Sequence, residues 1–443
     1  MDYPRRFAVA LSCVLFAGCG NHGFTAANSL IPSAAAPLSP ATASGTETVL
    51  YRFKGGKDGE FPEAPPTELN GVLYGTTFYG GSSTCAIYGA PPGCGIIFKI
   101  GVTGSGYRVI HRFPKTGLSG ASPYAAVVAS GKSLYGTTVW GGGKGCGALL
   151  GCGTVFKLDS SGGNYSILYK FGGRDGYAEY PGVAEMDGVL YGATVGGGTR
   201  KCSGGCGTLY SLSVSGKKAS LHKFVGGQDG EGPLNGPIVV KGILYGTTRF
   251  GGGAPCSNPS GPGCGIVYSI RSDGKGYRVL HRFQGGKDGA TPNNVIAVDG
   301  TLYGTTLIGG GTACNTGSGP GCGTVFRLST SGNGYRVLYR FRGGPNGWSP
   351  VSLLANIKET LYGATTFGGV YACGRAYGCG TVFELRTSGK GYRVLHAFSG
   401  GMDGENPNGA GPIAANGILY GTTLEGGSTC NYIGCGTVYA VTP

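Results

Sequence analysis

The chain has 443 residues, of which 94 are glycine and 24 are proline. A combined share of about a quarter is typical of low-complexity chains, but 40% of the residues are hydrophobic, which excludes a wholly disordered chain. The formal net charge is +14 and the chain carries 16 cysteines. The length allows two or three ordinary domains or one large repeat architecture.

The first 18 residues are typical of an export signal. Two arginines at 5–6 precede an apolar run over residues 7–17, which as a helix would cover only about half of a bilayer core. The run ends in the sequence FAGC, which resembles the lipobox of bacterial lipoproteins. The resemblance implies cleavage before Cys19 and lipidation of Cys19. The alternative is an ordinary secretory peptide in which this cysteine is incidental.

Residues 19–46 are rich in alanine, serine, proline and threonine, which predicts a flexible tether. We therefore expect an exported protein, held by a lipid anchor at the bacterial outer membrane or cell surface. Periplasmic or secreted locations are the alternatives.

Residues 47–443 contain seven copies of one unit, with a mean period of about 58 residues. Each unit has the string LYG followed by TT or AT, then a GCG string, then a run similar to YRVLHRF. The tyrosines of the first string are Tyr74, Tyr135, Tyr191, Tyr245, Tyr303, Tyr362 and Tyr420.

The unit at 284–341 shows how a copy is built. Short runs of apolar, β-branched and aromatic residues alternate with glycine-rich turns, which predicts strands. The four predicted strands cover 294–298, 301–306, 323–328 and 335–341. Four short antiparallel strands in each of seven units predict an all-β fold, a seven-bladed β-propeller.

The phase of the repeat predicts how the ring closes. The first strand-like segment, 48–53, has the sequence of a fourth strand, and the last, 436–441, has that of a third strand. The N-terminal strand is therefore expected to complete the C-terminal blade, which leaves no unpaired half-blade.

The order of these strings resembles two repeat families. The hairpin followed by a glycine pair and an aromatic fourth strand is similar to kelch propellers. The combination of LYGTT, a glycine pair and GCGTVF more closely resembles the GloVer tandem repeat of secreted and surface-anchored bacterial proteins, over about residues 47–443. That resemblance implies the repeat fold and no established activity.

Fourteen cysteines occur as one pair in each loop between the second and third strands. Because the number is even and the chain is expected to be exported, we predict disulfides. A zinc site is the alternative, but the spacing varies and these loops contain no histidine, so we predict no metal site and no cofactor. The predicted pairs are Cys85/Cys94, Cys146/Cys152, Cys202/Cys206, Cys256/Cys264, Cys314/Cys322, Cys373/Cys379 and Cys430/Cys435.

The fourth strands carry the basic excess. Strict alternation over 107–113 would place Tyr107, Val109, His111 and Phe113 on one face and the basic residues on the other. The resulting belt either protects strand edges or attracts anionic envelope polymers or lipid. Its members are Arg52, Arg108, Arg112, Lys170, Lys223, Arg278, Arg282, Arg336, Arg340 and Arg393.

One position of the fourth strand alternates between histidine and tyrosine. It holds His111, His222, His281 and His396 in four units and tyrosine in the others, at Tyr51, Tyr169 and Tyr339. A position that exchanges these two residues indicates packing or a hydrogen bond and not shared catalysis.

A recurring Asp-Gly pair follows the fourth strand. Its aspartates are either turn residues or an acidic ring around the channel mouth that could hold Ca²⁺ or sugar hydroxyls. Because the residue repeats around the ring, the turn interpretation is favoured. The aspartates are Asp58, Asp175, Asp229, Asp288 and Asp403, with Asn346 in one unit.

Residues that break the repeat are better candidates for a site. Large aromatic residues on the loop face could stack on sugars, or could seal the contact between blades. The candidates are Tyr79, Trp140, Phe250, Trp348 and Phe367. No catalytic residue is predicted, because the nucleophile-elbow, zinc-histidine and phosphate-loop motifs do not occur in the sequence.

These features favour a noncatalytic binding or scaffold module of the cell envelope, with a glycan or a protein as ligand. A secreted propeller enzyme acting on polysaccharide and a purely structural surface protein are the alternatives. An enzyme should show a polar cluster in the channel that only some blades contribute. We expect a monomer with a membrane contact through its lipid and with no nucleic-acid partner, since the basic residues form no stripe.

Overall fold

The computed structural model describes most of the chain from residue 44 onward. The predicted signal peptide, Cys19 and nearly all of the tether lie outside the described residues. The described residues are 44–81, 93–114, 118–143, 146, 151–177, 180–253, 256–258, 261–311, 314, 320–351, 353–369, 377–407, 411–428, 430 and 433–443.

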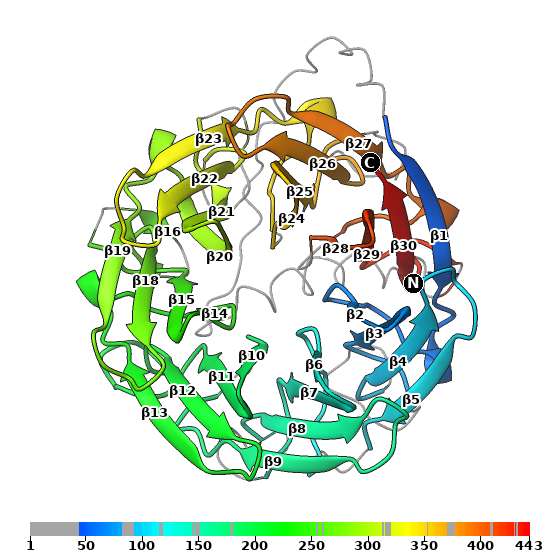
Figure 1. Cartoon of the computed structure of the whole chain (residues 1–443), viewed down its shortest axis with the longest axis horizontal. Helices are drawn as coiled ribbons and strands as arrows, with labels where there is room; N and C mark the ends of the chain where they lie inside the picture. Colours follow the sequence, from blue (N-terminus) through cyan, green and yellow to red (C-terminus); the bar gives the residue numbers. More distant parts are fainter. Residues whose placement is uncertain are drawn as a thin grey trace, which may run out of the picture.

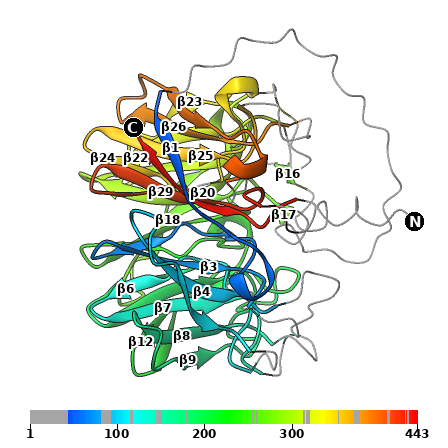
Figure 2. The ribbon, with the colours of Figure 1, turned by 90° about the vertical axis from the view of Figure 1, so that its right-hand side faces the viewer.

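Seven four-stranded antiparallel sheets surround a central axis like the blades of a propeller (Figure 1). In each blade the first strand lies nearest the axis and the fourth at the rim, and seen from the side the blades form a disc (Figure 2). The predicted all-β, seven-bladed fold is confirmed. Among the described residues the only helices are five short 3-10 turns: η1 (Gly56–Asp58), η2 (Gly227–Asp229), η3 (Gly286–Asp288), η4 (Gly344–Asn346) and η5 (Gly401–Asp403).

We number the blades in chain order. Blade 1 consists of β2 (Thr67–Leu69), β3 (Val72–Thr77), β4 (Ile96–Gly101) and β5 (Arg108–Arg112). Blade 2 consists of β6 (Val128–Ser130), β7 (Ser133–Thr138), β8 (Thr154–Asp159) and β9 (Ser166–Lys170). Blade 3 consists of β10 (Val183–Met186), β11 (Val189–Thr194), β12 (Thr208–Ser213) and β13 (Lys218–Lys223). Blade 4 consists of β14 (Ile238–Val240), β15 (Ile243–Thr248), β18 (Ile266–Arg271) and β19 (Arg278–Arg282).

The remaining blades keep the same order. Blade 5 consists of β20 (Ala290–Val298), β21 (Thr301–Ile308), β22 (Thr324–Ser329) and β23 (Arg336–Arg340). Blade 6 consists of β24 (Ala355–Ile357), β25 (Thr360–Thr365), β26 (Thr381–Arg386) and β27 (Arg393–Ala397). Blade 7 consists of β28 (Ile413–Ala415), β29 (Ile418–Thr423), β30 (Thr437–Thr442) and β1 (Thr46–Arg52). A small extra hairpin pairs β16 (Ser257–Asn258) with β17 (Gly261–Pro262).

The ring closes through the N-terminal strand, as predicted. β1 pairs with β30 in antiparallel register, from Thr46 opposite Thr442 to Arg52 opposite Thr437. The two strands lie side by side in both views (Figures 1 and 2). The last blade is therefore built from both ends of the described chain.

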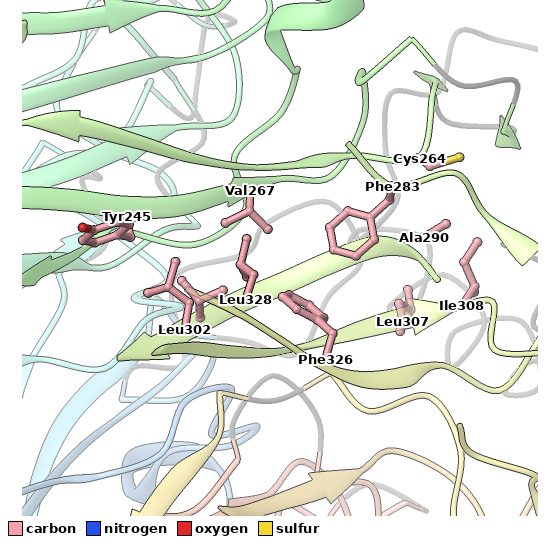
Figure 3. Packing of buried hydrophobic residues seen from close by; sticks show 11 residues of the cluster. Tyr245, Cys264, Val267, Phe283, Ala290, Leu302, Leu307, Ile308, Phe326 and Leu328 are labelled. Carbon is pink, nitrogen blue, oxygen red and sulfur yellow. The ribbon is translucent and has the colours of Figure 1, made fainter. Parts of the chain in front are cut away.

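The hydrophobic core lies between neighbouring blades. In Figure 3, Val267 and Phe283 of blade 4 face Leu302 and Phe326 of blade 5. The LYG glycine makes this packing possible, because a Cβ at Gly304 would lie 2.6 Å from the Phe326 ring. Each second strand therefore has glycine where the aromatic residue of the third strand crosses it.

The fourth strands contain a bulge, so the strict alternation predicted over 107–113 is wrong. Ile97 pairs with His111 while the next residue, Phe98, pairs with Val109, which leaves one extra residue in β5. An extra residue reverses the facing of side chains on its two sides. Tyr107 and Val109 consequently pack toward blade 7, whereas His111 and Phe113 pack toward blade 2.

The bulge brings the fourth strands of neighbouring blades into contact, and we call each such contact a seam. At five seams a tyrosine at the start of one fourth strand stacks on the histidine or tyrosine of the preceding blade, with centroids 3.6–4.0 Å apart. These tyrosines are Tyr107, Tyr165, Tyr277, Tyr335 and Tyr392. At the other two seams the position holds Lys218 and Glu47.

Among the described residues no helix has the length and hydrophobicity needed to cross a membrane.

Candidate functional site

The disulfides lie on the same face of the disc as the connections between blades. A Cβ at Gly285, in the connection that enters blade 5, would lie 2.8 Å from Cys256 Sγ of blade 4. The disulfide prediction is confirmed for Cys146–Cys152, Cys202–Cys206, Cys256–Cys264, Cys314–Cys322 and Cys430–Cys435. Cys94 and Cys379 are also disulfide-bonded, and their predicted partners, Cys85 and Cys373, lie outside the described residues. These bonds indicate an oxidising, extracytoplasmic environment.

The repeated aspartates hold the turns at the rim. Asp58 accepts hydrogen bonds from the Lys54 N–H at 2.8 Å and from the Tyr51 hydroxyl at 2.7 Å, and Gly59 follows with φ of 94°. The turn interpretation is therefore confirmed. The acidic ring around the channel mouth is wrong, because each of these carboxylates bonds to a fourth strand, which is the outermost strand of its blade.

Three histidines of the fourth strands contact the aspartate of the following turn, as Tyr51 contacts Asp58. His222, His281 and His396 each lie 3.1–3.2 Å through Nε2 from the aspartate of the following turn. His111 stacks on Tyr165, and its Nε2 has no hydrogen-bond partner among the described residues. The prediction of packing or a hydrogen bond at this position is therefore confirmed.

The basic belt is exposed at nine positions and half-buried at Arg52. Some of its members bind turn carbonyls: Arg52 Nε donates to Met402 at 2.8 Å and Arg340 Nε to Lys287 at 3.1 Å. These contacts favour a structural role at the rim.

A group of polar and aromatic side chains breaks the sevenfold repeat near the axis on this same face. Its members either follow a second strand or precede a first strand, and the first strands line the centre (Figure 1). We call the group the inner-loop cluster, which consists of Glu63, Tyr79, Tyr124, Tyr180, Arg249 and Glu425.

A repeated backbone feature fixes where these side chains lie. Two residues before Glu63 and Tyr124 the chain adopts positive φ, 56° at both Phe61 and Ser122. The N–H groups of these two residues donate to cysteine carbonyls of the preceding blade, at 3.1 and 2.7 Å. The connection between two blades is thus hydrogen-bonded to the preceding blade before it enters the first strand of the next blade.

The carboxyl group of Glu63 is the electrostatic centre of the cluster. Its side chain is buried, and Oε2 has no hydrogen-bond partner among the described residues. Burial, with a smaller contribution from Glu425, raises the pKa of Glu63 to about 8. Glu63 is therefore mostly protonated at neutral pH and can donate a hydrogen bond.

Three tyrosines surround this carboxyl group. The Tyr124 and Tyr180 rings meet edge to face with centroids 5.2 Å apart, and both are half-buried, whereas Tyr79 is buried. Burial raises the pKa of all three hydroxyls, to about 12 for Tyr180, and Glu63 raises each of them further. The hydroxyls therefore stay protonated at physiological pH.

Arg249 contributes the positive charge of the cluster from blade 4. Its side chain is 4% exposed, and its guanidinium lies over the Phe250 ring at 5.2 Å. Burial lowers the pKa of Arg249 to about 10, and Tyr124 partly opposes this shift. In blades 5 and 6 the equivalent positions hold Leu307 and Thr366. The cluster thus belongs to blades 1, 2, 3, 4 and 7.

The structure separates the five predicted aromatic residues into three places. Tyr79 belongs to the inner-loop cluster, and half-buried Trp140 packs against the group of buried apolar residues that includes Tyr79. Phe250 lies against Arg249. Trp348 and Phe367 pack against each other in blade 6, with centroids 4.7 Å apart, and Trp348 is only 9% exposed.

A separate cavity of about 230 Å³ lies nearer the axis between blades 6, 7 and 1. Its lining is mostly apolar and includes Pro65, Leu354, Ala355, Pro412 and Ile413.

Sequence reasoning missed most of the inner-loop cluster because it compared only the column five residues after each repeated tyrosine. Arg249 is the one charged residue among the seven that stand four positions after the repeated tyrosines. Glu63 and Tyr124 stand directly after a repeated proline. Comparison of these two columns would have identified three members, whereas their proximity across blades is visible only in the fold.

Two of the matching solved structures are oligogalacturonate lyases. One is from Vibrio parahaemolyticus, with 9% identity, a TM-score of 0.51, and coverage of 91% of this chain and 98% of that chain. The other was solved in complex with manganese, with 9% identity, a TM-score of 0.49, and coverage of 91% and 95%. The GH74 enzyme of Niastella koreensis has 14% identity and a TM-score of 0.44 over 79% of this chain and 46% of that one. At such identities the likeness shows the propeller fold alone.

No protein with a curated description matches the chain. A family model described as the Gloeobacter/Verrucomicrobia repeat matches residues 38–258, 200–371 and 256–443, which together include every described blade. The chain therefore belongs to the Gloeobacter/Verrucomicrobia repeat family.

Proposed function

We propose that this protein is an exported, lipid-anchored propeller of the cell envelope that binds a glycan at the inner-loop cluster without catalysing a reaction. One observation carries the proposal: aromatic rings, a buried carboxyl group and a buried guanidinium gather near the axis at positions where the repeat is broken, and blades 5 and 6 contribute none of them. Seam and turn residues recur from blade to blade, whereas a site for one ligand does not need to recur.

The chemistry of the cluster suits a saccharide. Half-buried Tyr124, Tyr180 and Trp140 offer ring faces for the apolar face of a sugar, while the tyrosine hydroxyls offer hydrogen-bond partners for its hydroxyl groups. Glu63, protonated at neutral pH, adds a donor that needs no counter-ion.

Binding can be tested on a glycan array followed by calorimetry with the best glycan. We expect the Tyr124→Ala/Tyr180→Ala variant to lose at least tenfold in affinity, since two ring contacts are removed. Tyr377→Ala is the matched control, because this exposed tyrosine lies in blade 6, away from the cluster. Unchanged affinity in the double variant would refute the site, as would an equal loss in the control.

A second candidate function, an enzyme acting on polysaccharide, is supported by the same asymmetry. A carboxyl group with a pKa near 8 beside a second carboxyl group, Glu425, is a common setting for a general acid. Release of reducing ends from an array-positive polysaccharide, abolished by Glu63→Gln, would establish this function in place of simple binding.

Export and anchoring rest on the resemblance at 16–19 and on the disulfides. Membrane fractionation and mass spectrometry of the N-terminal peptide test them directly. We expect a diacylated Cys19, and we expect Cys19→Ala to leave the folded protein outside the membrane fraction. A mature N-terminus at any other residue would exclude the lipid anchor.

A further inference from the structure

The seam between blades 6 and 7 is one of the two seams without the stacking tyrosine, and it is the one that has a carboxyl group in its place. At five seams a tyrosine stacks on the ring of the preceding blade, but at this seam the equivalent position of β1 holds Glu47. The ring it faces belongs to His396 of β27, and the turn between the two blades supplies Asp403. β1, which closes the propeller by pairing with β30 within blade 7, forms one side of this seam, which we call the closure seam.

These three side chains bring potential metal ligands together. The ligand atoms of Glu47, His396 and Asp403 all lie within 4.8 Å of one another. His396 Nε2 and Asp403 Oδ1 are 3.2 Å apart, close to the separation of about 3.3 Å between two ligands of a tetrahedral ion with bonds near 2.0–2.1 Å. Only small side-chain adjustments would be needed to bind one ion.

The carboxylate of Glu47 independently indicates that this group of side chains binds a ligand. Its Oε1 atom is buried and has no hydrogen-bond partner among the described residues. The tyrosine hydroxyl at other seams donates to a backbone carbonyl, as Tyr277 does to Asp229 at 2.7 Å. Glu47 gains no such bond, and a buried polar atom without a partner is unfavourable unless another group binds it.

Neighbouring groups orient the ligands and set the local charge. Asp403 Oδ2 accepts hydrogen bonds from the Ser399 N–H at 2.7 Å and the Ser399 hydroxyl at 3.0 Å, which leaves Oδ1 directed at the cluster. A bound ion would require the carboxyl groups of Glu47 and Asp403 to be deprotonated and His396 to be neutral, and their two negative charges would then balance a divalent cation. The nearby Arg52 donates through Nε to the Met402 carbonyl.

We propose that Glu47, His396 and Asp403 bind one Zn²⁺ ion, with water at the fourth position, and that this ion fastens β1 to blade 6 at the closure seam. One imidazole nitrogen and two carboxylate oxygens suit Zn²⁺ better than Ca²⁺, which prefers six to eight oxygen ligands. The ion would bind only the folded ring, because its ligands come from opposite ends of the chain. Binding therefore raises stability.

The experiment uses the full chain with its disulfides formed, without a tag, and with Cys13→Ser and Cys19→Ser to remove thiols outside the propeller. After treatment with a chelator, calorimetry with ZnCl₂ should show one ion per chain. The Tm should rise by about 2–4 °C at a Zn²⁺ concentration 100-fold above the Kd. Binding of no ion, or tighter binding of Ca²⁺ than of Zn²⁺, would overturn the proposal.

Three variants separate the proposed site from other zinc ligands. Glu47→Gln should lower the Zn²⁺ affinity at least tenfold. Glu47→Tyr restores the residue of five other seams, so it should keep or raise the Tm without metal and abolish the Zn²⁺ effect. His281→Tyr is the matched control at the seam between blades 4 and 5, and it should leave Zn²⁺ binding unchanged. Equal binding by the parent protein and both Glu47 variants would contradict the assignment.

Discussion

Tyr277 of blade 4 stacks on His222 of blade 3, with ring centroids 3.9 Å apart and ring planes 8° from parallel. The Tyr277 hydroxyl also donates to the Asp229 carbonyl at 2.7 Å, and the Asp229 carboxylate lies 3.1 Å from His222 Nε2. One tyrosine thus joins two blades and the turn between them. The blades share no strand pairing here, so this side-chain contact fastens the rim.

We expect Tyr277→Ala to lower the free energy of unfolding by about 3–4 kcal/mol, since it removes a largely buried ring, its stack and its hydrogen bond. Tyr277→Phe keeps the stack and should lower it by only about 1 kcal/mol. Urea denaturation of both variants provides the measurement. An effect of Tyr277→Phe as large as that of Tyr277→Ala would show that the hydroxyl, and not the ring, holds the seam.

His111 should make the protein sensitive to acid. Burial lowers the pKa of His111 to about 4, and its Nε2 has no hydrogen-bond partner among the described residues. The unfolded histidine titrates near 6.5, so between pH 6.5 and 4 the unfolded chain binds the proton more strongly. Stability is therefore complete above pH 6.5 and should fall by about 2–3 kcal/mol as the pH decreases to 4.

The variant His111→Tyr, which copies Tyr51, Tyr169 and Tyr339, should lose this contribution. The comparison is the difference in unfolding free energy between the variant and the parent, measured from pH 4 to 7.5. A difference that does not change with pH would mean that His111 has the same pKa in the folded and unfolded states.

Glu63 should make the protein less stable as the pH rises, which is the opposite of the effect of His111. Burial, together with Glu425, raises the pKa of Glu63 to about 8 from the ordinary value of 4.5. The folded state binds the proton more strongly, so stability is complete below pH 4.5 and decreases as the pH rises to 8. We expect Glu63→Gln, which cannot ionise, to gain about 3–4 kcal/mol relative to the parent between pH 5 and pH 8.5. Denaturation at the two pH values tests this, and an unchanged difference would place the Glu63 carboxyl in solvent.

Loss of the closing strand should be more damaging than any single substitution. Deletion of 48–53 removes most of β1, exposes the edge of β30, and removes Phe53, which is fully buried. We expect the deleted protein to unfold at least 10 °C below the parent by calorimetry. Phe53→Ala is a milder change that should lower the unfolding free energy by about 3–5 kcal/mol. Equal stability of the deletion and the parent would mean that blade 7 is complete without β1.

The sequence by itself determined the repeat, the number of blades, the closure and the pairing of cysteines. These depend on local patterns that occur seven times, so turn chemistry and strand periodicity are each confirmed by repetition. Even the exchange of His222 for Tyr169 at one position was enough to indicate a packing contact. The structure agrees because every copy must present the same faces to its two neighbours.

Tertiary structure alone decided the facing of the fourth strand and the composition of the inner-loop cluster. A bulge at one residue reverses the side chains around Ile110, and the alternating pattern of 107–113 does not reveal it, because a bulge depends on how the strand pairs with its neighbour. Glu63, Tyr180 and Arg249 are far apart in sequence and belong to one cluster only because blades 1, 3 and 4 surround one axis. Glu47 and His396 meet for the same reason, since closing a ring places the first strand against the blade that precedes the last.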